Sequence, residues 1–231
     1  MITVPPETTW YWQLSGRIHT NVAATLYDID QEDASTTLVA TLAASHTMIG
    51  YFSAGTWESW RSDAALFPAA AIGRSLPDWP GEKYLDIRNP DVRTIMGLRM
   101  DAAKAKGFVG IEPDNLDSFE NKSGFPLTRQ DAIAYIKWLA AAAHSRGMIC
   151  ALKNTPEVVP DVVGDCDFCI AEEPFRYNEA AAYTPFITAG KAVLAAEYGT
   201  FSAAKCRAAH NLKISLAFFN LALNGKKYQP C

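Results

Sequence analysis

The chain has 231 residues, of which 49% are hydrophobic and 20% are charged, and its net charge is −4. This balance predicts one globular domain with a large core and excludes a disordered chain, and no apolar run approaches the roughly 20 residues of a membrane helix. The negative charge and the lack of clustered Lys and Arg argue against a nucleic-acid partner and favour a neutral or cationic ligand.

Short β-rich segments recur along the chain with helical segments between them. They cover residues 11–16, 25–30, 48–55, 108–115, 148–154, 167–173, 192–199 and 213–220. Several are continuously apolar and turn polar at their C-terminal ends, which is typical of parallel strands buried on both faces. Eight such strands predict an α/β fold, a (β/α)8 TIM barrel, as a single domain over residues 1–231.

Two helices are predicted with clear ends. Residues 91–107 show helical spacing and stop at Gly107, and residues 128–147 begin at the N-cap Thr128 and stop at Gly147. The connection from Thr56 to Pro90 is rich in Trp, Pro and Gly and is too long for a simple linker. Loops of this length inside a compact domain are usually functional. We expect a salt bridge between Arg61 and Asp63 to hold it.

Cysteines stand at positions 150, 166, 169, 206 and 231. Their number favours an oxidising compartment and hence a secreted protein. The chain begins without a basic stretch and apolar core, so a secretory signal is either absent or already removed. Bridges from Cys206 to Cys231 and from Cys166 to another partner both stay open, because pairing cannot be read from a sequence. The C-x-x-C spacing at 166–169 lacks the second pair that a zinc site needs.

The predicted C-terminal strand ends are unusually acidic, and active sites of TIM barrels form there. The polar residues at these ends are Asp28, Asp30, Glu112, Asp114, Asp117, Lys153, Asn154, Glu172, Glu173, Glu197 and Tyr198. For a single acid, a helix cap or a salt bridge is the commoner role, and Asp30 and Asp117 suit it best. Glu112 and Asp114 lie two apart on one strand, so both face the barrel interior, where a carboxylate without a function is costly.

A pair of carboxyl groups on different strands suits glycoside cleavage. One group is protonated to assist the leaving oxygen, and the other attacks the anomeric carbon or activates water. Asp114 on the fourth strand and Glu172 on the sixth could face each other across the barrel mouth. Aromatic side chains could serve either as sugar platforms or as core packing; they are Trp10, Tyr11, Trp12, Tyr51, Trp57, Trp60, Trp79 and Tyr84.

Other chemistry has weaker support in the sequence. No GxGxxG, P-loop or GxSxG motif occurs, which argues against dinucleotide, nucleotide and serine-hydrolase sites. The four histidines show no metal-ligand spacing, so we expect neither a metal nor a cofactor. A divalent cation held by Glu112, Asp114 and Asp117 stays open as an alternative.

Several sequence blocks together resemble glycoside hydrolase family 114, the endo-α-1,4-polygalactosaminidase-like barrels. The resemblance runs through most of the chain, in YDID, GYFSAGTWESWRSDAALFP, WPGEKYLDIR, GIEPDNLDSFENKSGFPLT, AHSRGMICALKN, AEEPFRYNE and AEYG. It implies that the catalytic carboxylates are Asp114, in the EPDN motif, and Glu172, in a segment that is NEQC-like in the family. Ala171 stands where the family commonly has Asn. Pro174 and Ala180 stand at cysteine positions of the family, which suggests that a local disulfide is missing.

The resemblance implies an enzyme that cleaves an α-1,4-linked galactosamine-rich polysaccharide, such as galactosaminogalactan. We expect a monomer that cleaves it internally and, by comparison with other α-retaining barrels, with retention. Asp114 would be the nucleophile and Glu172 the general acid/base. Ammonium groups of the substrate would meet an acidic rim of Asp28, Asp30, Glu112, Asp117, Glu173 and Glu197. Tyr51, Glu112, Asn115, Lys153 and Tyr198 would position the substrate. The alternative is a non-catalytic, spherulin-like barrel that binds carbohydrate.

Overall fold

The computed structural model describes residues 2–231, and its main sheet contains eight parallel strands in chain order. The parallel strands are β1 (Trp10–Gln13), β2 (Leu26–Asp30), β3 (Thr47–Ser53), β7 (Gly110–Asp114), β8 (Ile149–Lys153), β9 (Phe168–Glu172), β10 (Val193–Tyr198) and β11 (Ser215–Phe219). Each predicted strand segment overlaps one of them, and β1 and β3 each begin one residue earlier than predicted, which confirms the predicted TIM barrel.

The barrel is almost closed. A ninth strand, β12 (Tyr228–Pro230), pairs antiparallel with β11. In the part of the chain that the structure describes, no strand ladder joins β1 to β11. Side chains bridge the seam instead: Trp10 Nε1 donates to the Ser215 carbonyl at 3.1 Å, and Tyr228 Oη donates to the Trp10 carbonyl at 2.8 Å.

Alternate residues of the strands face the barrel interior. One apolar cluster fills the lumen with side chains such as Trp12, Ile49, Ile170, Ala196 and Phe219. A second, larger cluster packs the outer faces of the strands against the helices. Since side chains alternate along a strand, the polar residues two positions beyond a lumen residue also face inward, at the mouth of the barrel.

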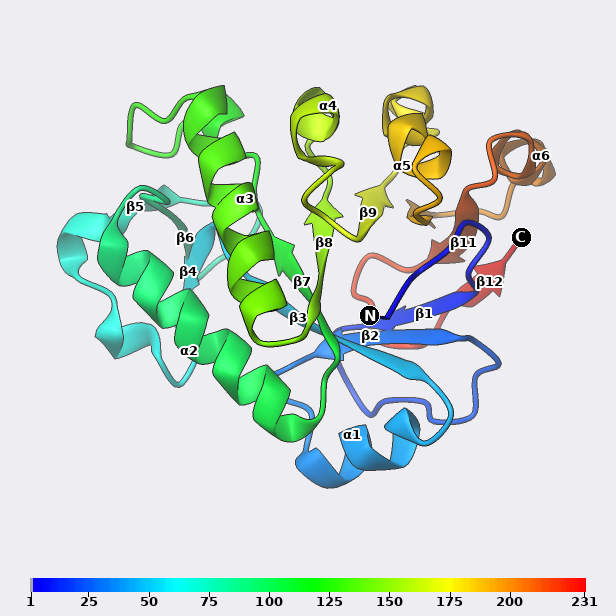
Figure 1. Ribbon diagram of the computed structural model, residues 1–231, viewed down its shortest axis with the longest axis horizontal. Helices are drawn as coiled ribbons and strands as arrows, with labels where there is room; N and C mark the ends of the chain where they lie inside the picture. Colours follow the sequence, from blue (N-terminus) through cyan, green and yellow to red (C-terminus); the bar gives the residue numbers. More distant parts are fainter. Residues whose placement is uncertain (1) are drawn as a thin grey trace.

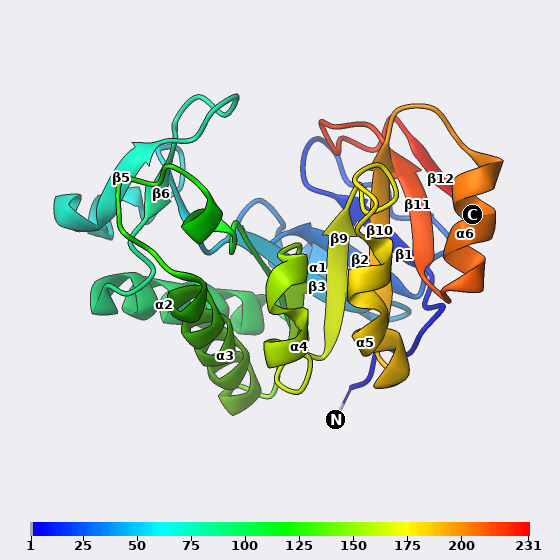
Figure 2. The ribbon, with the colours of Figure 1, turned by 90° about the horizontal axis from the view of Figure 1, so that it is seen from above.

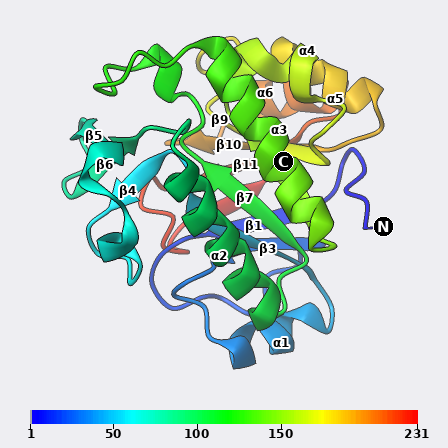
Figure 3. The ribbon, with the colours of Figure 1, turned by 60° about the vertical axis from the view of Figure 1, so that its left-hand side comes forward.

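Helices cover the outside of the sheet (Figure 1). They are α1 (Thr36–Ala43), α2 (Pro90–Lys106), α3 (Arg129–Ser145), α4 (Val159–Val162), α5 (Thr184–Thr188) and α6 (Ala203–Asn211). Short 3-10 turns are η1 (Ala64–Leu66), η2 (Ala69–Ala71), η3 (Ser118–Glu120), η4 (Pro156–Val158) and η5 (Ala180–Tyr183). Helix α1 lies on the opposite side of the molecule from α4 and α5 (Figure 3).

The two helices with predicted ends form as expected. Thr128 caps α3 in a reciprocal capping box with Asp131, and Gly147 follows the helix with a positive φ of 68°. Gly107 ends α2 in the left-handed conformation, with φ 103°. These local signals fix where α2 and α3 begin and end, and so where the adjoining strands start.

The long segment after β3 forms a second, small sheet at one end of the molecule, opposite α6 (Figure 2). Its strands are β4 (Thr56–Glu58), β5 (Ile72–Ser75) and β6 (Glu82–Leu85), in the order β4-β6-β5. The prediction of an Arg61–Asp63 pair is wrong. Arg61 instead binds Asp30 at 2.7 Å and Glu58 at 2.8 Å, while Asp63 binds Arg99 of α2 at 2.7 Å. Salt bridges therefore do hold the segment, but to the barrel and α2.

The structure joins Cys206 of α6 to Cys231 by a disulfide and leaves Cys150, Cys166 and Cys169 as buried free thiols. The bridge ties the C-terminal strand region to α6. No helix within residues 2–231 is long and apolar enough to span a membrane.

Candidate active site

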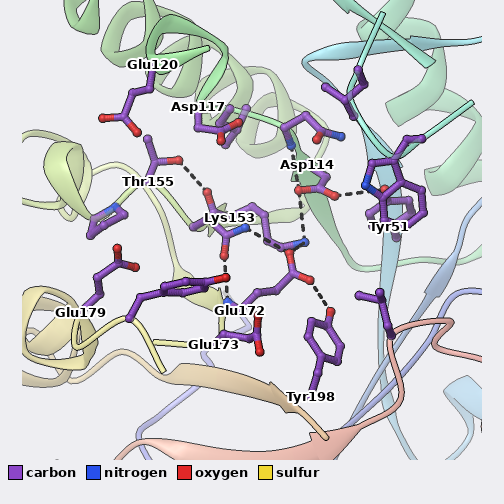
Figure 4. Close-up of a pocket in the computed structure, with 18 of the residues that line it drawn as sticks. Tyr51, Asp114, Asp117, Glu120, Lys153, Thr155, Glu172, Glu173, Glu179 and Tyr198 are labelled. Atoms are coloured by element: carbon purple, nitrogen blue, oxygen red, sulfur yellow. Dashed lines mark hydrogen bonds and ion pairs between the residues drawn. The ribbon is translucent and has the colours of Figure 1, made fainter. Parts of the chain in front are cut away.

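A cleft of about 450 Å³ opens at the C-terminal ends of the barrel strands (Figure 4). Its lining is rich in carboxylates: Glu82, Asp114, Asp117, Glu120, Glu157, Glu172, Glu173 and Glu179. Among the described residues that line it, Lys153 carries the single basic side chain. The cleft therefore presents a strongly negative surface to a ligand.

Lys153, the last residue of β8, connects the acids at the centre of the cleft. Its side chain is 1% exposed, and its Nζ lies 2.8 Å from Glu112 Oε1, 3.2 Å from Asp114 Oδ1 and 3.4 Å from Glu172 Oε2. Burial opposes the charge of Lys153, but the three carboxylates outweigh it and raise the pKa of Lys153 well above its usual value. The ammonium group therefore stays charged and holds three carboxylates around one point.

Asp114 ends β7 and stays accessible, with 16% of its side chain exposed. Besides Lys153, it accepts hydrogen bonds from Tyr51 Oη at 3.1 Å and from the backbone N–H of Asn115 at 2.7 Å. These donors fix the orientation of the carboxylate. An oriented carboxylate at the surface of a cleft can act as a nucleophile or a base.

Glu172 ends β9 and faces the same cleft with 28% of its side chain exposed. It accepts hydrogen bonds from Tyr198 Oη and from Asn154 Nδ2, the latter at 3.1 Å. Burial by itself would raise the pKa of Glu172, but Lys153 and the donors Tyr198 and Asn154 more than offset it and lower the pKa. Asn154 also accepts from the Glu172 backbone N–H at 2.8 Å, so it fixes both ends of this residue.

The backbone turns sharply just beyond the strands that carry these groups. Asn115, Asn154, Thr155 and Glu173 all have positive φ, between 47° and 61°. Non-glycine residues in this conformation are strained, and such strain concentrates at functional sites. In each case the turn redirects the chain directly after Asp114, Lys153 or Glu172.

Five of the predicted substrate-contact residues lie in the wall of the cleft. Tyr51, Asn115, Lys153, Glu173 and Tyr198 all line it. Asn115 also donates to Ser53 Oγ at 2.9 Å, and Glu173 pairs with Arg176 at 2.7 Å, so part of their polar capacity is used within the protein.

Four predicted contacts with substrate need correction, because Asp28, Asp30, Glu112 and Glu197 do not line the cleft. Asp28 and Glu112 lie deeper in the lumen, with 0% exposure. Asp30 binds Arg61. Glu197 points away from the lumen, where it binds Lys205 of α6 and accepts from the backbone N–H groups of residues 175 and 176.

Glu112 supports the site from below. Burial, together with the charge of Asp114, raises the pKa of Glu112 above its usual value, while Lys153 opposes that rise and favours the ionised form. It accepts from Lys153 Nζ at 2.8 Å and from Trp12 Nε1 at 3.0 Å. Its role is to hold Lys153 rather than to meet a ligand.

The sequence did not single out the outer acids of the cleft. Glu120, Glu157 and Glu179 belong to loops and 3-10 turns after β7, β8 and β9. Burial and the neighbouring charges of Glu157 and Asp117 raise the pKa of Glu120. In the sequence, the one feature that pointed to these three acids as residues of the cleft was their position after predicted strand ends.

The aromatic candidates divide between core and cleft. Trp10, Tyr11 and Tyr84 are buried and belong to the packing. Trp79, which is 50% exposed, lines the cleft with Trp12 and Tyr51, and so does Tyr177, which was not predicted. Exposed aromatic faces in a polar cleft suit sugar rings.

The alternative of a divalent cation between Glu112, Asp114 and Asp117 finds no support in this geometry. The ammonium group of Lys153 lies within 3.2 Å of the first two carboxylates, in the place that a cation would need. Across residues 2–231 no group of three or more His, Cys, Asp or Glu side chains is arranged to hold a metal ion.

Comparisons with known proteins agree on one group of relatives. The family model described as glycoside-hydrolase family GH114 matches residues 1–231. The crystal structure of Aspergillus fumigatus Ega3 in complex with galactosamine has 34% sequence identity and a TM-score of 0.94, covering 100% of this chain and 97% of that one.

Two further relatives are more distant. The glycoside hydrolase domain of PelA from Pseudomonas aeruginosa has 14% identity and a TM-score of 0.75, covering 94% of this chain and 96% of that one, which shows a shared fold. A protein of Deinococcus radiodurans is 26% identical over 220 residues, which cover 82% of this chain and 71% of the relative.

Proposed function

Because the chain belongs to glycoside-hydrolase family GH114, we propose that it cleaves an α-1,4-linked, galactosamine-rich polysaccharide internally and with retention. Residues 1–231 form the catalytic domain, with Asp114 as nucleophile and Glu172 as general acid/base. The observation that carries this proposal is the shared contact of Asp114 and Glu172 with Lys153 at the floor of an acidic cleft. The galactosamine bound to Ega3 supports the choice of sugar.

Asp114 and Glu172 lie close together around Lys153, and their spacing bears on the stereochemistry of cleavage. Both distances start from Lys153 Nζ, so Asp114 Oδ1 and Glu172 Oε2 cannot be farther apart than the sum of 3.2 Å and 3.4 Å. Retaining enzymes hold their carboxyl groups roughly 5–5.5 Å apart, and inverting enzymes roughly 6.5–9.5 Å apart, because a water must fit between them. A direct attack by Asp114 on the anomeric carbon needs no such space.

In the proposed first step, Asp114 forms a bond to the anomeric carbon while Glu172 gives its proton to the departing glycosidic oxygen. In the second, Glu172 takes a proton from water, whose oxygen attacks the anomeric carbon and releases Asp114. Lys153 holds both carboxylates in place throughout. Since its contacts lower the pKa of Glu172, the protonated form that starts the reaction becomes scarcer as the pH rises. We therefore expect an acidic optimum.

The charge of the cleft supports a cationic substrate. Glu120, Glu157 and Glu179 extend the negative surface beyond the catalytic pair (Figure 4 labels Glu120 and Glu179). A partly deacetylated galactosamine chain carries ammonium groups that these carboxylates can meet. Trp79 and Tyr177 offer aromatic faces for the sugar rings.

Product analysis on defined oligomers tests the proposal. The enzyme is incubated with α-1,4-linked oligomers of galactosamine and of N-acetylgalactosamine, and the chain length and anomer of the products are followed by mass spectrometry and NMR. Internal cleavage with an α-anomer as first product is expected. A β-anomer would contradict retention, and binding without new reducing ends would instead support the non-catalytic carbohydrate-binding alternative.

Substitution of the nucleophile tests the assignment of residues. We expect Asp114→Asn to lower kcat by about a thousand-fold or more, because the amide cannot attack the anomeric carbon. Asp33→Asn, an exposed aspartate beside α1, is the matched control and should keep its activity. Normal hydrolysis by the Asp114→Asn variant would overturn the assignment.

A further inference from the structure

Asp28, in the middle of β2, is a buried carboxyl group that the proposed reaction does not use. Its exposure is 0%, and neither of its two oxygens receives a hydrogen bond from an N–H or hydroxyl donor within the described residues. An ionised carboxylate in such a place would lack both solvent and donors, which is very costly. The position therefore calls for an explanation of how the group is stabilised.

The polar group that acts most strongly on Asp28 is another carboxyl group. Glu112 of β7 is likewise 0% exposed, and in addition to burial its charge and side chain act directly on the Asp28 carboxyl group and raise its pKa. The other charged groups that face it are Asp114 of β7 and Lys153 of β8. On the neighbouring strands its register partners are Trp12 of β1 and Ile49 of β3, neither of which titrates.

Two buried carboxyl groups in contact cannot both be ionised, so one of them holds a proton. Glu112 has two donors of its own, Lys153 Nζ and Trp12 Nε1, which favour its ionised form. Asp28 has none. The proton therefore resides on Asp28, which donates it in a hydrogen bond to Glu112. Burial and the adjacent Glu112 charge raise the pKa of Asp28 well above its usual value, in agreement with this assignment.

We propose that Asp28 is a positioning residue of the catalytic centre: as a neutral carboxyl group it donates a hydrogen bond to Glu112, keeps Glu112 ionised, and so anchors Lys153 between Asp114 and Glu172. The roles of Asp114 and Glu172 rest on the proposed function, whereas the protonation of Asp28 does not. Asp28 touches no substrate, since it lies below the cleft and acts through Glu112 and Lys153.

Loss of this donor has a defined consequence. Glu112 would stay buried but would lose one of its hydrogen-bond donors. Its carboxylate would therefore take up a proton and become neutral. Lys153 would then lose one of its three counter-charges and interact more strongly with the other two. Because a negative charge near Glu172 disappears, the pKa of Glu172 falls, and the form that can act as general acid becomes rarer.

Two substitutions separate the donor from the carboxyl group. Asp28→Asn keeps a donor to Glu112, and Asp28→Leu has a similar size without one. On the oligomer that the wild type cleaves, we expect Asp28→Leu to lower kcat by on the order of ten-fold or more while KM changes little. The alkaline limb of its kcat/KM profile should move to lower pH. Asp28→Asn should lose less than about three-fold in kcat and keep the wild-type pH profile.

The kinetics of these two variants either support or overturn the proposed role of Asp28. If Asp28→Asn were as impaired as Asp28→Leu, or if the pH profile of Asp28→Leu matched the wild type, the proposal would be overturned. A purely structural role would lower the fraction of folded enzyme but leave the pH profile of the remaining activity unchanged.

Infrared spectroscopy covers the case in which Asp28→Leu does not fold. At neutral pH the difference spectrum of wild type minus Asp28→Asn should contain the carbonyl stretch of one protonated carboxyl group. Absence of that band would overturn the proposal. The measurement uses no substrate, so it stands even if the enzyme acts on a different polysaccharide, and inactivity of the wild type on galactosamine oligomers would count against the proposed function alone.

Discussion

Asp114 and Glu172 contact the same ammonium group but differ in their remaining partners. Asp114 is oriented by Tyr51 and by the backbone of Asn115, and Glu172 by Tyr198 and Asn154. The two carboxyl groups therefore lie in different hydrogen-bonding environments. Different environments allow two carboxyl groups to take different roles in one reaction.

The hydrogen bond from Tyr198 gives a test of the general acid. It favours the ionised form of Glu172, so Tyr198→Phe should raise the pKa of Glu172. The protonated form would then persist to higher pH, and the alkaline limb of the kcat/KM profile should shift upward in pH. Tyr51→Phe, which removes a donor to Asp114 instead, is the control and should not cause that shift. A limb that stays in place in Tyr198→Phe would argue against Glu172 as the acid.

At the scale of strands, the alternation of side chains decides which acids reach the site. On β10, Leu194 and Ala196 face the lumen, and Tyr198 continues that face at the cleft, whereas Glu197 lies on the other face and binds Lys205. The same alternation turns both Glu112 and Asp114 of β7 inward. On β10 it separates Glu197 from Tyr198, so the sequence pattern by itself argues against Glu197 as a substrate contact.

The depth at which a side chain lies in the barrel was harder to predict than whether that side chain faces inward. Asp28 and Glu112 both face inward, as their spacing indicates, yet they lie below the cleft. Strand tilt and the lengths of the surrounding loops set the level at which a barrel opens to solvent. A sequence does not state these directly.

The turn between β3 and β4 gives a prediction for an element that supports the nucleophile. Gly55 donates its N–H to the Asp114 carbonyl at 3.0 Å, and a Cβ on Gly55 would lie 1.6 Å from the Asn115 carbonyl oxygen. Gly55→Ala must therefore displace the backbone beside Asp114. We expect it to lower the free energy of unfolding by at least about 2 kcal/mol and to lower kcat.

Urea unfolding and steady-state kinetics measure both effects of Gly55→Ala. The matched control is Gly164→Ala, since a Cβ at Gly164 would meet nothing within 4 Å. Equal stability of the two variants would show that the β3–β4 turn adapts without strain.

At the scale of the whole molecule, negative charge is concentrated in the cleft far beyond what the net charge of −4 indicates. Carboxylates from the small sheet, from η3 and η4 and from the loop after β9 converge there. The overall charge suggested a cationic ligand, and the fold supplies the place at which such a ligand would be attracted.

This concentration of charge predicts a salt dependence that varies with acetylation. For a galactosamine oligomer, KM should rise by on the order of ten-fold between about 0.05 and 0.5 M salt, because ions screen the ammonium–carboxylate attraction. An N-acetylgalactosamine oligomer of the same length carries no ammonium groups and should show little change. Parallel salt dependence for the two oligomers would indicate that the rim acids do not bind the amino groups.

The sequence by itself determined the eight parallel strands, the ends of α2 and α3, and the strand ends that carry Asp114, Lys153 and Glu172. These features follow from local periodicity, from caps and from the rule that parallel strands open at their C-terminal ends. Only the tertiary structure decided that Lys153 contacts three carboxylates, that Arg61 binds Asp30 and Glu58, and that Asp28 lies buried against Glu112. Such contacts join residues from different strands and loops, and their distances depend on barrel tilt and loop packing, which no local pattern encodes.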